Sequence, residues 1–136
     1  MIAAAWFGSA VCLLAIATPA AFRASPNATA AANVVGAMLT PWHYVALAAP
    51  LLLLLLPKGG IKLPQSVLAI AILLAATQAI IDTQIRSIRM KSPVPISALS
   101  RQNPVRRKFG ILHGISSLAL LGEAIAAAVV IARTDP

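Results

Sequence analysis

Four long apolar segments alternate with polar stretches along the chain, and this alternation is the strongest pattern in the sequence. The segments cover about residues 2 to 22, 31 to 56, 66 to 86 and 109 to 132. A helix needs roughly 20 mostly apolar residues to cross the hydrocarbon core of a bilayer, and each segment is long enough. The pattern predicts an all-α integral membrane four-helix bundle with up-down topology, formed by residues 1–136 as a single domain.

The polar stretches between these segments contain residues that break helices. "RASPNAT" follows the first span, and "PKGGIKLPQ" between the second and third reads as a tight turn. Residues 87–108 form one long basic loop, and Pro93, Pro95 and Pro104 argue against a helix throughout it. The first span has no basic leader, and it is longer than the apolar core of a signal peptide, so we expect a retained helix.

Composition supports the membrane interpretation. Of the 136 residues, 60% are hydrophobic and only 10% are charged; the mean hydropathy is +0.88. A soluble domain carries about 25% charged residues, which excludes that class. The net charge is +8, and its basic residues lie between the apolar spans. The sequence contains no nucleic-acid-binding module. Anionic lipid headgroups are therefore the expected partners, and nucleic acid is not.

The distribution of Lys and Arg predicts the orientation in the membrane. One side of the bundle carries three, namely Lys58, Lys62 and Arg133. The other side carries Arg23 and the group that we expect to face lipid headgroups: Arg86, Arg89, Lys91, Arg101, Arg106, Arg107 and Lys108. Cytoplasmic loops carry the excess of basic residues, so both termini are expected outside and the basic loop in the cytoplasm. A bacterial inner membrane is the expected location.

Polar residues inside the spans are the candidate functional groups. On the fourth span, one arc carries a histidine, two serines and a carboxylate, whereas the opposite arc is apolar: Ile115, Leu118, Leu121, Ile125 and Val129. Gly122 and Ala126 are small enough to let a neighbouring helix approach closely. The full set of candidate intramembrane polar residues is His43, Gln78, Asp82, His113, Ser116, Ser117 and Glu123.

Depth suggests how these groups pair. With a rise of about 1.5 Å per residue, His43 comes level with Glu123 near the midplane, and Asp82 with His113 nearer the cytoplasm. Gln78 is four residues from Asp82 and shares its face. A charge at this depth costs at least about 2.5 kcal/mol, so Glu123 should be protonated or paired with an imidazolium at His43. The cluster is either a proton or cation path or a polar knot that fixes helix register.

Other chemistry receives less support from the sequence. Two histidines on different spans could ligate a b-type haem, but His43 and His113 differ by about 12 Å in depth. The segment "TPWHY", residues 40–44, is either a break that lines a ligand cleft or a proline kink packed by large rings. We find no metal-ligand spacing, phosphate loop or catalytic triad, and the single Cys12 is uninformative.

Three stretches carry a resemblance to a known family. They are "ATPAAF" at the end of the first span, "AANVVGAMLTPWHY" in the second, and "FGILHGIS" at the start of the fourth. In these the chain resembles the DUF4149/TMEM205-like family of small four-span membrane proteins. The resemblance implies a four-helix membrane architecture, and it implies no particular activity.

The sequence thus leaves two main functions open. The first is a non-catalytic accessory or scaffold subunit of a larger membrane complex, with other membrane subunits or further copies of the chain as partners. The second is a small transporter or proton/cation-translocating protein that uses the intramembrane His, Asp and Glu residues. A b-type haem-binding subunit is a remote third. Any cofactor is unknown, and we expect no enzyme activity.

Overall fold

The computed structural model describes residues 1–56 and 64–134, and these are helical apart from short connections. In chain order the elements are α1 (Ile2–Val11), η1 (Cys12–Ala17), α2 (Thr18–Ala24), α3 (Ala28–Leu55), α4 (Gln65–Lys91), η2 (Ile96–Ala98) and α5 (Pro104–Thr134). Four continuous helical stretches are long and apolar enough to cross a membrane: residues 2–24, 28–55, 65–91 and 104–133. The predicted all-α, four-helix architecture is confirmed.

The first span contains one wide turn. Residues of η1 adopt a π-helix, in which the amide of Thr18 donates to the carbonyl of Leu13, five residues earlier. Pro19 follows directly. A proline clashes with the carbonyl four residues before it and removes one hydrogen bond. The widened turn relieves that conflict, so α1, η1 and α2 continue as one helix.

Helix α3 continues through its two internal prolines, Pro41 and Pro50, without a break. The interpretation of "TPWHY" as a segment packed by large rings holds for Trp42, which is 5% exposed. It does not hold for Tyr44, which is 74% exposed. At the start of α3, Asn27 Oδ1 accepts a hydrogen bond from the amide of Ala30 (2.9 Å). That bond satisfies one of the free amides of the first turn.

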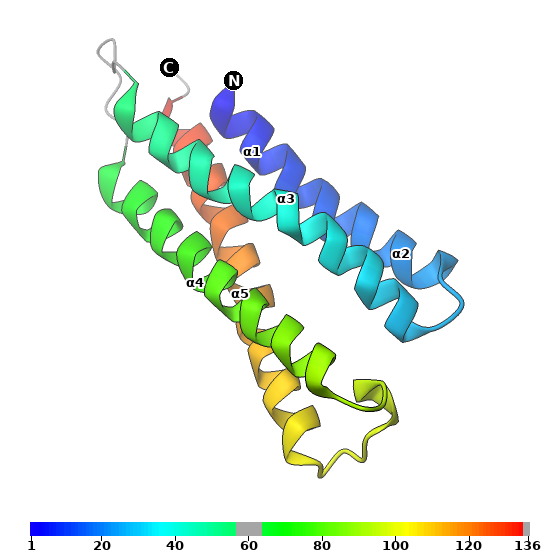
Figure 1. Ribbon diagram of the computed structural model, residues 1–136. Helices are drawn as coiled ribbons and strands as arrows, with labels where there is room; N and C mark the ends of the chain where they lie inside the picture. The colour runs from blue at the N-terminus through cyan, green and yellow to red at the C-terminus, as the bar shows by residue number, and fades with distance from the viewer. Residues whose placement is uncertain (57–63, 135–136) are drawn as a thin grey trace.

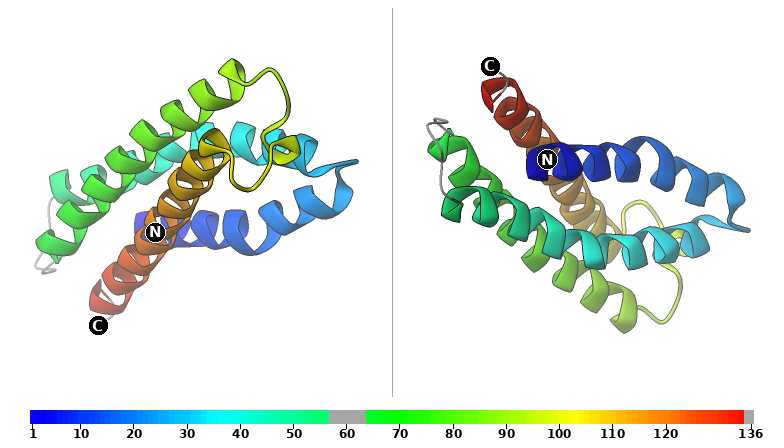
Figure 2. Two further views of the ribbon diagram at one scale, coloured as in Figure 1. Left: turned by 90° about the horizontal axis from the view of Figure 1, so that it is seen from below. Right: turned by 90° about the horizontal axis from the view of Figure 1, so that it is seen from above.

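The four spans converge at one end of the bundle and separate at the other. The N and C labels lie together at the end that we call the terminal end (Figure 1). The opposite end, which we call the loop end, holds the α2–α3 and α4–α5 connections. There the α2–α3 pair diverges from the α4–α5 pair, as Figure 1 and Figure 2 both show.

The packed core lies in the terminal half of the bundle. It contains Trp6, Trp42 and Leu68 together with many alanines, among them Ala46, Ala71 and Ala127. Small side chains let the helix backbones approach closely where lipid supplies no hydrophobic driving force. The face of α5 that the sequence predicted to meet lipid is exposed at four of five positions: Ile115, Leu118, Leu121 and Ile125 are exposed, and Val129 is half-buried.

The basic loop is shorter than the sequence predicted. Helix α4 runs on to Lys91 and α5 begins at Pro104, so the connection covers residues 92–103 rather than 87–108. Proline is favoured as the first residue of a helix because its missing N–H has no helical partner there. Asn103 Oδ1 also accepts from the amide of Val105 (2.9 Å), which caps the same turn. The predicted tight turn at residues 57–63 lies outside the described residues.

Candidate functional site

A cavity of about 740 Å³ occupies the loop half of the bundle, between the two diverging helix pairs. Its wall includes residues from the first span, α3, α4 and α5. Five residues of the predicted polar cluster line it: Gln78, Asp82, His113, Ser116 and Ser117. A second hollow of about 610 Å³ lies toward the α4–α5 connection and shares the lining residues Ala32, Asn33, Arg89 and Phe109 with the first.

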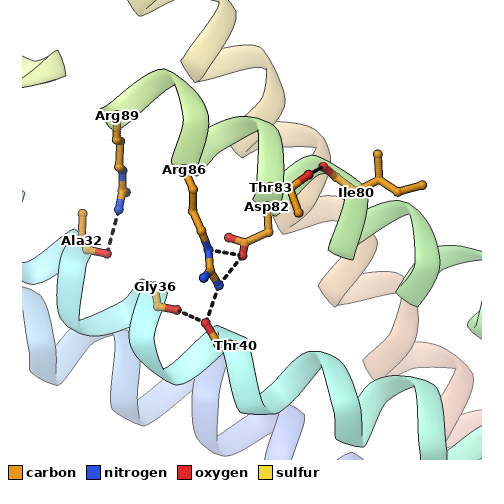
Figure 3. Close-up of polar contacts among 8 residues, drawn as sticks. All are labelled: Ala32, Gly36, Thr40, Ile80, Asp82, Thr83, Arg86 and Arg89. Carbon is orange, nitrogen blue, oxygen red and sulfur yellow. Dashed lines mark hydrogen bonds and ion pairs between the residues drawn. The ribbon is translucent and has the colours of Figure 1, made fainter. Parts of the chain in front are cut away.

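Asp82 pairs with Arg86 one turn further along α4. Arg86 Nε donates to Asp82 Oδ2 at 2.8 Å, and Arg86 Nη2 lies 2.7 Å from the same oxygen. Arg86 Nη2 also donates to Thr40 Oγ1 on α3, which in turn donates to the carbonyl of Gly36 (Figure 3). The predicted Asp82–His113 pair is therefore wrong, because an arginine on the same face of α4 takes the carboxylate.

Arg89 extends from α4 across the cavity mouth toward α3. Its Nη1 donates to the carbonyl of Ala32 (3.3 Å). Its side chain extends toward α3 in the same direction as that of Arg86, which contacts Thr40 (Figure 3). Its guanidinium carbon lies 5.3 Å from the centre of the Phe109 ring on α5, within cation–π range. In the part of the chain that the structure describes, Asp82–Arg86 is the one ion pair; Arg89 makes no salt bridge there, although the Asp82 carboxylate is close enough to interact with it electrostatically.

Gln78 marks the inner end of the cavity. Its side chain is 0% exposed, and neither the amide nitrogen nor the amide oxygen has a hydrogen-bond partner among the described residues. A buried amide without partners costs roughly 1–3 kcal/mol. The sequence placed Gln78 on the face of Asp82, and the structure confirms that both line the cavity.

The predicted polar arc of α5 divides between the interior and the cavity rim. Ser116 is buried, whereas His113 and Ser117 are exposed. The His113 ring stacks on Phe109 with centroids 6.1 Å apart. Ser117 Oγ donates to the backbone carbonyl of His113 (2.9 Å), not to its imidazole.

Glu123 lies apart from the cavity, in the packed core. It is 0% exposed, and within residues 1–56 and 64–134 neither carboxyl oxygen has a hydrogen-bond partner. Its chain neighbours Leu120 and Ala124 pack in the core cluster with both tryptophans. His43 Nε2 is also unpartnered, so the predicted His43–Glu123 pair is wrong. Equal depth on two helices does not make two side chains face each other.

The basic residues of the predicted headgroup-facing group separate into three kinds. Arg106 is half-buried and holds the loop, since its Nη1 donates to the carbonyls of Ser97 (3.2 Å) and Leu99. Arg86 and Arg89 line the cavity. The remaining four side chains are exposed at the loop end, and contact with lipid headgroups stays a prediction for them: Lys91, Arg101, Arg107 and Lys108.

The sequence contains a signal for the cavity arginines that the prediction missed. Gln78, Asp82, Arg86 and Arg89 are spaced by four, four and three residues, the spacing of one helix face. The stripe joins the two intramembrane polar residues to the two arginines in a single wall. Thr40 and Asn33 of α3 line the same cavity and were not among the predicted site residues.

Metal and haem chemistry receive no support from the geometry of the described residues. They include no group of three or more His, Cys, Asp or Glu side chains that could hold a metal ion. His113 lines the cavity and His43 does not, so the two imidazoles do not face each other across it.

The chain was compared with protein-family models, curated proteins and solved structures, and none of them matches it. Function is therefore inferred from the cavity and its lining.

Proposed function

We propose that the protein is a small transporter or carrier that takes a small molecule from the cytoplasmic side of the membrane into its cavity. The observation that carries this proposal is Gln78, a fully buried and unpartnered amide at the inner end of a cavity that is lined by arginines at its mouth. An unpartnered polar group in that position lowers the stability of the empty protein, and a bound molecule gains a hydrogen bond from it.

The depth of the cavity supports entry from one face of the membrane. The 27 residues of α4 extend about 40 Å, whereas the hydrocarbon core is about 30 Å thick. Counted from Gln65, Arg86 and Arg89 come at the headgroup level of the loop end, and Gln78 comes within the hydrocarbon. The loop end is the one that the Lys and Arg distribution predicts to be cytoplasmic.

The charges of the lining favour an anionic or neutral substrate over a cation. Two arginines line the cavity against one aspartate, and that aspartate is paired with Arg86. Glu123 and His43 are not among the lining residues, so they do not extend a polar row across the bilayer from this cavity. The proposed substrate is therefore an organic molecule that the arginines attract, rather than a proton or metal cation.

The second candidate is the accessory or scaffold role, and Tyr44 favours it. The side chain is 74% exposed, and it lies about 17 Å along α3 from Leu55, near the middle of the bilayer. A tyrosine hydroxyl normally sits at the interface, where water meets it. A neighbouring subunit or a second copy of the chain would cover the hydroxyl at this depth.

Thiol labelling tests access to the cavity. In a Cys12→Ala background, Ser116→Cys places a near-isosteric thiol in the cavity wall, and Ala119→Cys places one in packed protein on the same helix. We expect a membrane-impermeant maleimide to label Ser116→Cys in inverted vesicles and to leave Ala119→Cys unlabelled. A transporter also exposes the first thiol, more slowly, in right-side-out vesicles.

Two outcomes would contradict the proposal. Equal resistance of both thiols from either face would mean that the cavity is sealed, and the accessory role would then be preferred. Labelling of both thiols at similar rates would mean that the helices are loosely packed and that the cavity is no defined site.

A further inference from the structure

We propose that the occupant of this cavity is a single-chain amphiphilic organic acid, with its acid group at Arg89 and a neutral hydrogen-bonding group at Gln78. The inference rests on the proposed function, because it names the substrate class of the same cavity. It combines an arginine without a salt bridge, a buried amide without a hydrogen-bond partner, and the apolar side chains of the first span and α3 that line the same cavity.

Arg89 supplies the acid-binding end. A guanidinium has five N–H donors in a planar fork that matches a carboxylate or phosphate. Among the described residues it donates one hydrogen bond, to Ala32, and its face rests on Phe109. A Cβ at Gly36 would lie 3.7 Å from Arg89 Nη1, so the small residue leaves room beside the fork. The free donors point to an anion that comes from outside the described chain.

Arg86 cannot replace Arg89 in this role. Its Nε and Nη2 already meet Asp82, and Nη2 also meets Thr40. That pair is locally neutral and ties α4 to α3. The uncompensated positive charge of the cavity is therefore at its mouth, where an acid group can stay at headgroup level while its chain enters the hydrocarbon.

Gln78 supplies the neutral end. Its amide offers two donors and one acceptor with two lone pairs, and all are unmet in the described residues. A hydroxyl on the ligand would donate to the amide oxygen or accept from the amide nitrogen, whereas a carbonyl would only accept from the nitrogen. A second charged group is disfavoured there, because an ionised group at hydrocarbon depth is costly. The two ends of the cavity therefore differ in the chemistry that they accept.

The spacing of the two polar ends sets the length of the ligand. Arg89 and Gln78 are eleven residues apart on α4, a rise of about 16 Å. The Asp82–Arg86 pair lies between them on α4, and apolar side chains, among them Phe22 of α2 and Leu39 of α3, line other parts of the cavity wall. The volume of about 740 Å³ falls within the usual range for small-molecule pockets. The rise along α4 between the two polar ends, rather than the volume, therefore sets the chain length of the ligand.

Matched ligands of one chain length test both ends. The probes are dodecanoic acid, omega-hydroxydodecanoic acid, the corresponding diol, dodecyl phosphate and inorganic phosphate. Binding to the full-length protein in nanodiscs is measured by calorimetry, with empty nanodiscs subtracted. We expect the hydroxy acid to bind about threefold to tenfold more tightly than dodecanoic acid and at least about tenfold more tightly than the diol. Dodecyl phosphate against dodecanoic acid then shows which acid group Arg89 prefers.

Two variants assign each preference to its residue. Gln78→Leu should abolish the advantage of the hydroxyl and keep that of the acid, and Arg89→Gln should do the reverse. The controls are Gln84→Leu, an exposed glutamine of α4, and Arg101→Gln in the loop, and both should keep both preferences. Gln78→Leu removes an unsatisfied amide and should fold at least as stably as the wild type, so the test does not depend on Arg89→Gln alone.

The outcomes separate this inference from the proposed function. If Ser116→Cys is labelled but the diol binds as tightly as the acids, the cavity is open and the acid assignment is overturned. If inorganic phosphate alone competes fully, or the hydroxyl preference survives in Gln78→Leu, the amphiphile assignment is overturned. Protection of the Ser116→Cys thiol by the hydroxy acid, and not by the diol at equal concentration, supports it.

Discussion

At the scale of single residues, the buried polar groups differ in what surrounds them. Gln78 borders a cavity, whereas Glu123 is enclosed by packed side chains. An unpaired charge in dry protein is costly, and replacing a buried polar group by an apolar one of similar shape is often stabilising. Glu123 therefore lowers the free energy of unfolding, and its replacement by an apolar residue of similar shape should raise it.

We expect Glu123→Met to raise the free energy of unfolding by about 1–3 kcal/mol, because a side chain of similar length replaces a carboxyl group without partners. Thermal unfolding in detergent measures this. Binding of the omega-hydroxy acid should be unchanged, since Glu123 does not line the cavity. Asp82→Asn is the contrasting variant, and it should lower stability because Arg86 loses its ion pair. A lower melting temperature for Glu123→Met would mean that the carboxyl group has a partner in the membrane.

The sequence predicted which polar residues lie inside the membrane and missed how they pair. Depth follows from counting residues, so the positions of Gln78, Asp82 and Glu123 along the bundle axis could be estimated. The direction in which a side chain points depends on the rotation of each helix about its axis. That rotation is set by how the side chains of neighbouring helices interlock, which a single sequence does not display. Arg86 was therefore assigned to lipid headgroups, although it binds Asp82.

At the scale of elements, the contact between α4 and α5 depends on one small residue. A Cβ built on Gly122 would lie 2.9 Å from Leu74 Cδ1. The sequence predicted this close approach from the spacing of Gly122 and Ala126, and Ala126 is indeed buried. A larger residue at position 122 has to displace Leu74 or separate the two helices.

Gly122→Leu should destabilise the protein by about 1–3 kcal/mol, the usual cost of overpacking a tight contact. The matched control is Gly114→Leu on the same helix, where an added Cβ meets nothing within 4 Å. Unfolding of the two variants in detergent gives the comparison. Equal stability of both variants would show that α4 and α5 are not held together at Gly122.

At the scale of the whole molecule, the helical architecture was predictable because each span is a long apolar run. The ends of the helices were less predictable, since α4 and α5 continue into polar residues that were predicted to belong to the loop. Such residues can remain helical at headgroup level, where water and lipid solvate their charges. The cavity was not predictable, because it arises from the divergence of two helix pairs.

The predicted orientation can be tested by labelling at both ends. In the Cys12→Ala background, Ser100→Cys in the basic loop should react with an impermeant maleimide in inverted vesicles only. Gln65→Cys at the start of α4 should react in right-side-out vesicles only. Replacing Arg106, Arg107 and Lys108 by glutamine should lower the fraction of molecules in this orientation, because these residues provide much of the charge bias. Reaction of Ser100→Cys from the outer face would reverse the assignment of the cavity mouth.

The lengths of the two connections at the loop end have a mechanical consequence. Only three residues, 25–27, separate α2 from α3, whereas twelve residues, 92–103, separate α4 from α5. A link of three residues has little slack, so the ends of α2 and α3 at this end of the bundle cannot separate. Any widening of the entrance between α3 and α4 must therefore break the hydrogen bonds from Arg86 to Thr40 and from Arg89 to Ala32.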